Sequence, residues 1–344
     1  MKSFAAFLIF FFTCTSWGRT WEILEIPGAK CGDGSSYHIF IDRRSSEKLT
    51  VEFMGGGACW DAWSCYGPLS RTWLHPIPKI PLFSTISSGY EGVSPVSEDT
   101  VVYLPYCTGD VFAGSHVAQY QMNLNVRHSG YQNTVQVFNF LHESGAIPFS
   151  LVKRVVVTGS SAGAIGAFIH APTIDAFMPK DAERILLADS PGLHFGPNFW
   201  HKFSKKMFLD FRQVFARIGL EIDYDNGLVA PQMGHVCEVL NQWKIGVLQS
   251  TLDPVMSEGF GDISPQEHRS VIYSANGLPE AIKGAKNCSA WVPDVSQHTF
   301  MLLPFTATIK ALGKTAKWYF KAVLSQLNPP SLVDRRKEHE KISK

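Results

Sequence analysis

A serine flanked by glycines follows a run of β-branched residues near the middle of the chain. Residues 154–164 read RVVVTGSSAGA, which predicts a strand that passes through a small-residue turn into a helix. This pattern is typical of a nucleophile elbow, in which a serine hydroxyl projects from the edge of a sheet. Gly159 and Gly163 lie two residues on either side of Ser161. We therefore predict Ser161, rather than Ser160, as the nucleophile of a serine hydrolase.

A second glycine-rich segment follows an earlier predicted strand at 49–54. Three consecutive glycines, residues 55–57, lead into Ala58, and glycine lets backbone amides turn toward one point without obstruction by Cβ atoms. Hydrolases with an elbow build their oxyanion hole from such a loop and from the residue after the serine. We therefore predict that the amides of Gly57, Ala58 and Ala162 stabilise a developing oxyanion. A phosphate-binding loop is disfavoured because no Lys-Ser or Lys-Thr pair follows the glycines.

The acid and the base of a catalytic triad are expected after the serine, in the order serine, acid, histidine. His298 lies in a turn-rich segment, residues 291–300, before an apolar run. Asp253 follows one predicted buried strand, and Asp189 ends another. The carboxyl ends of parallel strands meet at the edge of the sheet where ligands bind. We predict Asp253 as the triad acid and His298 as the base, with Asp189 as the competing acid or otherwise a supporting residue.

These segments together resemble the pectin acetylesterase and Notum family, most closely its bacterial-type members, from about residue 20 to residue 320. The resemblance is carried by residues 55–60 with Asp61 and Cys65, by 105–116, by the elbow, by 188–192, by Asp253 and by 297–298. It implies an α/β-hydrolase fold and a triad of Ser161, Asp253 and His298. It also implies removal of an acyl group from an oxygen ester without a metal or an organic cofactor.

One position departs from the family pattern and leaves the acyl length open. Many relatives place a tryptophan directly after the glycines, whereas this chain has Ala58, with Trp60 two positions later. The family joins plant and microbial members linked to acetylated polysaccharide with an animal branch linked to a fatty acyl group on a signalling protein. The resemblance implies foremost a secreted esterase that removes acetyl groups from a polysaccharide. A lipase or protein O-deacylase for longer chains, and a catalytically silent glycan- or partner-binding protein, are the alternatives.

The N-terminal segment has the features of a secretory signal. An apolar stretch at residues 4–12 is too short to span a bilayer and is followed by small residues suited to a cleavage site. We interpret residues 1–18 as a signal peptide and 19–344 as one α/β-hydrolase domain. Within that domain, about 328–344 is a charged segment expected to fray. The expected location is extracellular or periplasmic.

Six cysteines lie beyond that segment, an even number in a chain expected to enter an oxidising compartment. They are Cys31, Cys59, Cys65, Cys107, Cys237 and Cys288. Six cysteines allow fifteen pairings; we expect Cys59 to pair with Cys65 across the oxyanion loop. We expect Cys237 to pair with Cys288 around the segment that carries Asp253. Free buried thiols remain an alternative, whereas a metal site is disfavoured because no C-x-x-C or paired histidine spacing occurs.

Alternating strands and helices are needed to bring these residues together. Strands are predicted at 36–42, 48–54, 100–105, 152–158, 184–188, 244–250 and 268–274, and helices at 129–144, 162–170, 199–219 and 306–326. This alternation predicts a mostly parallel sheet with helices on both faces, as in an α/β-hydrolase-like fold. The proline- and serine-rich residues 68–97 are interpreted as a loop insertion over the rim of the active site.

Aromatic and polar residues in the predicted loops are candidates for substrate contacts. We select Trp60, Trp63, Asp110 and His116, and Trp73 lies in the same group of loops. Such rings stack on sugars, line acyl pockets or fill a core, and the alternative role of Asp110 and His116 is to fix their loop. The formal net charge is +1 with 18% charged residues, a balance that indicates no nucleic-acid partner. No later segment is apolar enough to span a membrane. We expect a monomer whose partner is an acylated carbohydrate or another ester.

Overall fold

A sheet of ten strands organises the chain in the computed structural model, which describes residues 12–334 apart from 69, 71, 76–83 and 327. The strands, in spatial order, are β1 (Phe12–Ser16), β2 (Arg19–Lys30), β3 (Ser36–Asp42), β5 (Thr100–Leu104), β4 (Lys48–Phe53), β8 (Arg154–Ser160), β9 (Glu183–Asp189), β10 (Trp243–Leu248), β11 (Cys288–Val292) and β14 (Leu332–Val333). The strands β1, β2, β3 and β5 pair antiparallel, and every pair from β5 through β4 to β14 is parallel. The sheet is therefore mixed and mostly parallel.

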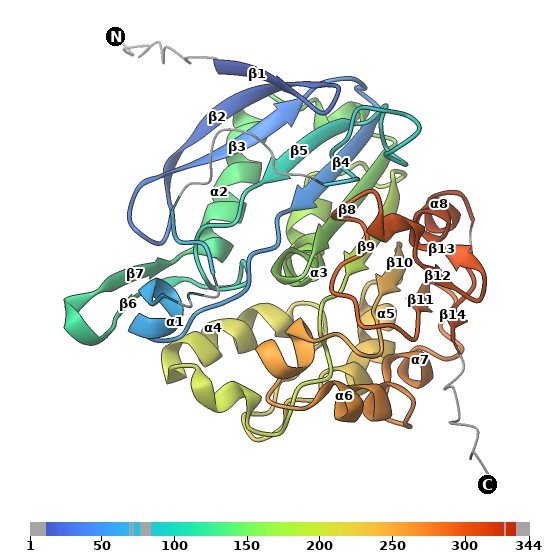
Figure 1. Cartoon of the computed structure of the whole chain (residues 1–344). Coiled ribbons are helices and arrows are strands. Elements are labelled where there is room, and N and C mark those ends of the chain that lie inside the picture. The colour runs from blue at the N-terminus through green and yellow to red at the C-terminus, as the bar shows by residue number, and fades with distance from the viewer. Residues whose placement is uncertain (1–11, 69, 71, 76–83, 327, 335–344) are drawn as a thin grey trace, which may run out of the picture.

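Helices cover both faces of this sheet (Figure 1). They are α1 (Ala62–Tyr66), α2 (Gly130–Glu143), α3 (Ala162–Asp175), α4 (Lys205–Ala216), α5 (Met233–Val239), α6 (Pro265–Ile272), α7 (Leu278–Ala281) and α8 (Ala316–Ser325). Side chains of α2 and α3 share one core cluster with Val155 and Val157 of β8, whereas α8 packs with Val156. Successive residues of a strand face opposite sides of a sheet, so α8 lies on the face opposite α2 and α3. The run of valines is buried on both faces, as expected for a central parallel strand.

The chain between β9 and β10 contributes a group of aromatic side chains, here called the aromatic wall, to the larger core cluster. Its buried members are Phe195, Phe199, Trp200, Phe203, Phe211 and Phe215. This stretch carries α4 and α5, and its phenylalanines pack on one another, with 3.9 Å between the ring centroids of Phe195 and Phe199. Two small hairpins complete the structure, β6 (His116–Gln119) with β7 (Asn125–His128) and β12 (Lys310–Ala311) with β13 (Lys314–Thr315). The described part of the chain contains no helix that is both long and apolar enough to cross a bilayer.

The α/β-hydrolase-like fold class predicted from the sequence is confirmed. Every predicted strand before residue 251 corresponds to an observed strand, within two residues at each end. The strand predicted at 268–274 is wrong, because the segment forms α6. Ser264 caps this helix, and Glu267 returns a hydrogen bond to the backbone of the cap, so the local capping box outweighs the β-branched residues that suggested a strand.

The C-terminal part of the chain differs from expectation in two places. The helix predicted at 306–326 begins at Ala316, because the hairpin β12 and β13 precedes it. The tail expected to fray from about residue 328 is instead structured up to residue 334, where β14 pairs with β11. Residues 335–344 lie outside the described residues, as do residues 1–11 of the predicted signal peptide. Cleavage after residue 18 would also remove β1.

Three disulfides connect the six cysteines. Cys59–Cys65 and Cys237–Cys288 are the two predicted pairs, and Cys31–Cys107 is the third. The pairs close sequence separations of 6, 51 and 76 residues respectively. They confirm the expectation that these cysteines form disulfides rather than free thiols.

Candidate active site

Ser161 lies in the turn between β8 and α3, at the carboxyl end of the parallel strands. Its backbone angles, φ 58° and ψ −123°, belong to a region that strains any residue with a Cβ atom. Its N–H donates to the carbonyl oxygen of Asp189 at 2.8 Å in the neighbouring strand. A Cβ atom on Gly163 would lie 2.0 Å from the carbonyl oxygen of Phe53, so α3 begins this close to β4 only with glycine there. The strained turn and the tight helix start reproduce the predicted elbow geometry.

His298 and Asp253 form a hydrogen-bonded pair in the loops that follow β11 and β10. The loop after β10 carries Asp253 and the loop after β11 carries His298, and both strands run parallel to β8. Nδ1 of His298 lies 2.8 Å from Oδ2 of Asp253. Asp253 is fully buried, and its Oδ1 accepts hydrogen bonds from the backbone N–H groups of Val255 at 3.0 Å and Met256 at 2.9 Å. A buried carboxylate held on Nδ1 leaves Nε2 as the atom that can act as a base.

The competing acid, Asp189, has different partners. Its carboxylate accepts hydrogen bonds from the backbone N–H groups of Phe300 at 2.8 Å and Met301 at 2.7 Å. Burial raises the pKa of Asp189 to about 6, although these amides oppose the increase. Since its main-chain oxygen also binds the Ser161 N–H, Asp189 connects the elbow to the loop that carries His298. Among the described residues, the carboxylate bonded to that imidazole is Asp253.

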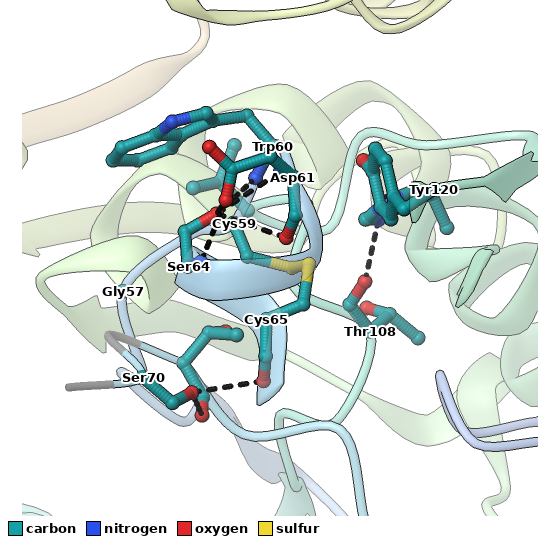
Figure 2. The surroundings of a disulfide bond; sticks show 12 residues. Gly57, Cys59, Trp60, Asp61, Ser64, Cys65, Ser70, Thr108 and Tyr120 are labelled. Atoms are coloured by element: carbon teal, nitrogen blue, oxygen red, sulfur yellow. Dashed lines mark hydrogen bonds between the residues drawn. A yellow bond between two sulfur atoms is a disulfide. The ribbon is translucent and has the colours of Figure 1, made fainter. Parts of the chain in front are cut away.

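The glycine-rich loop after β4 lies beside the elbow and is restrained by a hydrogen bond from Tyr106 and by a disulfide. Gly57 has φ 72°, a left-handed conformation that favours glycine, and its carbonyl oxygen accepts a hydrogen bond from the Tyr106 hydroxyl at 2.8 Å. Just beyond it, Cys59 and Cys65 form a disulfide across the start of α1 (Figure 2). The amide of Ala162 belongs to the first turn of α3, where N–H groups have no partner within the helix.

An apolar cavity begins at the predicted oxyanion donors. Gly57, Ala58, Ser161 and Ala162 line it, together with the aromatic wall between β9 and β10. Its described lining carries no ionisable side chain: besides these four residues it consists of Val111, Ile165, Phe168, Ile169, Pro191, Leu193, Phe195, Phe199, Trp200, Phe203, Phe211, Phe215, Ile218, Leu220, Val229, Met233, Met256 and Phe260. The cavity volume is about 70 Å³. An apolar site of this small volume suits a small apolar group.

A larger cleft lies on the other side of the serine. Ser161 and His298 both line it, so the hydroxyl and the imidazole share one space of about 460 Å³. Its wall is part polar and part aromatic: Glu52, Trp73, Tyr103, Ser160, Thr299, Leu302 and Leu303 contribute to it. The site selection from the sequence omitted Glu52 and Tyr103. A carboxyl group within an otherwise apolar predicted strand was the signal that could have identified Glu52.

None of the four residues selected as substrate contacts is among the described residues that line the cavity or the cleft. Trp60 packs edge-on against Phe203, with ring centroids 5.7 Å apart, and Trp63 points to solvent with 68% of its surface exposed. Asp110 is fully buried and accepts hydrogen bonds from the backbone N–H groups of residues 112, 114 and 130. His116 forms a buried pair with Asp210, with Nδ1 and Oδ2 2.6 Å apart. Asp110 and His116 therefore hold their loop in place, which is the alternative role expected for them, and direct contact with substrate stays a prediction.

One group of potential metal-ligating side chains occurs among the described residues. Cys59, Cys65 and His128 bring their ligand atoms within 4.8 Å of one another. The two sulfur atoms are bonded to each other, so they do not offer the thiolates that a metal of this ligand set requires. The group is a disulfide packed beside a buried histidine.

A mostly parallel sheet with a serine on a strained strand-to-helix turn, followed by an Asp–His pair from later strands, defines the α/β-hydrolase class. Within this class the chain belongs to the pectinacetylesterase family, whose model matches residues 22–216. Pectin acetylesterase 4 of Arabidopsis thaliana is a relative, 27% identical over 164 residues.

The family match covers one part of the candidate site. The alignment with the Arabidopsis protein spans 45% of this chain and 39% of the relative, so the chain matches well under half of that protein's length. The family match includes Ser161 and the glycine-rich loop. Asp253 and His298 lie beyond residue 216, outside the family match, so their assignment depends on the geometry described above.

Proposed function

We propose that the protein is a secreted serine carboxylester hydrolase that removes acetyl groups from hydroxyl groups of a polysaccharide. One observation carries the proposal: Ser161 and His298 line the same cleft, and Nδ1 of the imidazole is hydrogen-bonded to the buried carboxylate of Asp253. Membership of the pectinacetylesterase family supports ester chemistry on acetylated sugars. The three disulfides support export to an oxidising compartment.

The proposed reaction proceeds in two acyl-transfer steps. Nε2 of His298 accepts the proton of the Ser161 hydroxyl as Oγ attacks the ester carbonyl. The bond to the alcohol then breaks, and Nε2 returns the proton to the leaving alkoxide. Water attacks the acetyl-enzyme with the same help from Nε2, which releases acetate and restores the hydroxyl. The amides of Gly57, Ala58 and Ala162 stabilise the oxyanion in both steps.

The size of the apolar cavity supports a short acyl group. An apolar cavity of about 150 Å³ in another protein holds benzene, whereas the cavity beside Ser161 measures about 70 Å³. Benzene has six non-hydrogen atoms, so a cavity of about half that volume holds about three of them. An acetyl group has this size. An acetyl methyl placed here would leave its carbonyl oxygen near the amides of Gly57, Ala58 and Ala162, which line the same cavity.

Replacing Ser161 tests the proposal directly. Because the hydroxyl forms the covalent intermediate, Ser161→Ala should lower kcat on 4-nitrophenyl acetate by roughly 10⁴-fold or more and abolish labelling by a fluorophosphonate. The matched control is Ser160→Ala, which removes the adjacent hydroxyl and should keep both the labelling and most of the rate. Equal rates for Ser161→Ala and the unmodified protein would reject the proposal. Absence of labelling in the unmodified protein would favour a catalytically silent binding protein.

A hydrolase for longer acyl chains is the second candidate, and the apolar wall of the cavity favours it. The lining of the cavity also includes Phe215 and Met233, and methionine side chains adapt readily to new shapes. The same assay discriminates the candidates when the acyl group is lengthened from acetyl to octanoyl. We expect kcat/KM to fall about tenfold or more along this series. A rise along the series would select the longer acyl chain instead.

A further inference from the structure

We propose that Asp294 is a positioning residue of the triad: by binding the Thr251 hydroxyl, it holds the loop that carries Asp253 against the loop that carries His298. The inference rests on the proposed esterase function and adds side chains that act on the reaction through its acid and its base. Neither Thr251 nor Asp294 is among the described residues that line the cavity or the cleft. Their effect on the substrate is therefore indirect.

The two loops begin side by side. β10 and β11 are parallel neighbours in the sheet, and the loops start where these strands end. Thr251 comes two residues before Asp253, and Asp294 comes four residues before His298. The N–H of Thr251 donates to the carbonyl oxygen of Pro293 at 3.2 Å, so the pairing of the strands continues into the loops. A shift of one loop along the other would change the distance between the carboxylate and the imidazole.

One carboxylate joins these loops through side chains. Oγ1 of Thr251 donates to Oδ1 of Asp294 at 2.5 Å, and Nη2 of Arg269 in α6 donates to Oδ2 at 2.5 Å. Thr251 is fully buried, and the side chain of Asp294 is 5% exposed. Nδ1 of His268, also in α6, donates to the main-chain oxygen of Thr251 at 2.8 Å. Hydrogen bonds to a charged group are stronger than those between neutral groups, so α6 and Asp294 fix Thr251 from two sides.

The reaction is sensitive to this fixation because the imidazole must reach the serine hydroxyl and the acid at the same time. A displacement of about 1 Å in such a group can lower a rate by about 100-fold. Other contacts between the loops remain when the Thr251 hydroxyl is removed. Oγ of Ser250 still donates to the carbonyl oxygen of Gln297 at 2.5 Å. The loops should therefore stay folded but hold the acid and the base less accurately.

Removal and restoration of one hydroxyl test the inference. Thr251→Val has nearly the shape of threonine without the hydroxyl, and it should lower kcat on 4-nitrophenyl acetate by about 10- to 100-fold. Because Thr251 does not line the substrate spaces, kcat and kcat/KM should fall together. Thr251→Ser keeps the hydroxyl and should retain most of the rate.

A second group of the same three residue types offers a matched control. Oγ1 of Thr50 donates to Oδ2 of Asp99 at 2.8 Å, and Nη2 of Arg154 pairs with Oδ1 of Asp99 at 2.6 Å. Thr50 is also fully buried. Asp99 and Arg154 lie at the amino ends of β5 and β8, whereas the catalytic loops follow the carboxyl ends. Thr50→Val should therefore lower the midpoint of urea unfolding as Thr251→Val does, but it should leave kcat unchanged.

A second variant keeps the test decisive if Thr251→Val does not fold. Arg269→Met removes the other side-chain partner of Asp294 at a position where 18% of the side chain is exposed. It should lower kcat and kcat/KM together. The matched control is Arg154→Met, at a position where 22% of the side chain is exposed, and it should not lower either value.

The outcomes separate this inference from the proposed function. Full kcat in folded Thr251→Val, or an equal loss of kcat in Thr50→Val, would overturn the role of Asp294 and leave the esterase intact. A higher KM with unchanged kcat would also overturn it, because it would indicate a contact with substrate. Absence of hydrolysis of 4-nitrophenyl acetate and of fluorophosphonate labelling in the unmodified protein would overturn both.

Discussion

Two buried carboxylates near the proposed base have partners of different kinds, and this difference predicts different roles. Asp253 binds the His298 imidazole, whereas Asp189 binds backbone amides of the segment that follows it. The first arrangement orients a proton acceptor and stabilises its charged form. The second holds a loop in register with the elbow. We therefore propose a chemical role for Asp253 and a structural role for Asp189.

Substitution of each acid by asparagine should separate these roles. Asp253→Asn presents an amide to Nδ1 and favours the wrong imidazole tautomer, so kcat should fall by about 10³- to 10⁴-fold with little loss of stability. Asp189→Asn keeps one acceptor oxygen for the amides of Phe300 and Met301. It should lower the free energy of unfolding by about 1 to 3 kcal/mol and reduce kcat much less. Rate assays and urea unfolding of both variants measure this, and a reversed order of the two kcat effects would assign the triad acid to Asp189.

The secondary-structure elements bring these groups together because consecutive parallel strands end at one edge of the sheet. The strands β8, β10 and β11 deliver the serine, the acid and the histidine in chain order. The glycine-rich loop after β4 reaches the same edge, since β4 pairs directly with β8. Its disulfide restrains a loop whose described residues form the five-residue helix α1 and isolated bridges from Gly57 to Thr72 and from Ala58 to Asp110.

The disulfides should therefore differ in how they affect stability and activity. The cost of removing a disulfide grows with the loop that it closes, so Cys237→Ala with Cys288→Ala should cost about 4 kcal/mol, for a separation of 51 residues. Cys59→Ala with Cys65→Ala should cost about 2 kcal/mol, for a separation of 6 residues. The second pair should nevertheless lower kcat more, because it borders the oxyanion loop. Urea unfolding and ester hydrolysis at a temperature where both variants fold compare the two effects, and a larger loss of kcat in the first pair would contradict this account.

At the scale of the whole molecule, the interior holds several uncharged imidazoles. Burial lowers the pKa of His128 to about 4, of His170 and His194 to about 3, and of His268 below its usual value. In the unfolded chain these histidines have a pKa near 6.5. Between pH 6.5 and the lowered values, the unfolded chain binds more protons than the folded one. The folded state is therefore destabilised as pH falls.

The buried carboxyl groups act in the opposite direction but are fewer. The raised pKa values of Glu52, about 7, and Asp189, about 6, make the folded chain bind more protons between about pH 4 and 7. This partly offsets the effect of the four histidines. We expect a net loss of about 1 to 3 kcal/mol per pH unit between pH 6.5 and 5, and a nearly flat profile from pH 7.5 to 8.5. Urea unfolding at these pH values measures the slope, and greater stability at pH 5 than at pH 7 would show that the carboxyl groups dominate.

Local sequence determined much of the framework. The valine run and its framing glycines specified β8 and the tight turn into α3, because a strained turn needs small neighbours within two residues. The same glycines predict Ser161, rather than Ser160, as the nucleophile. The disulfide between Cys59 and Cys65 was also predictable locally, because the two cysteines are only 6 residues apart in the sequence. The segment at 268–274 was misread, since the capping residues that make it helical precede the β-branched side chains that suggested a strand.

Only the tertiary structure decided which distant groups meet. The choice of Asp253 over Asp189 as the partner of His298, the position of Trp60 and Trp63 outside the two spaces beside the serine, and the presence of Glu52 in the cleft were not encoded in any short segment. The volume of the acyl cavity depends on side chains from several elements that pack together. Backbone conformation follows from neighbours in sequence, whereas side-chain contacts between residues far apart follow from how the whole core packs.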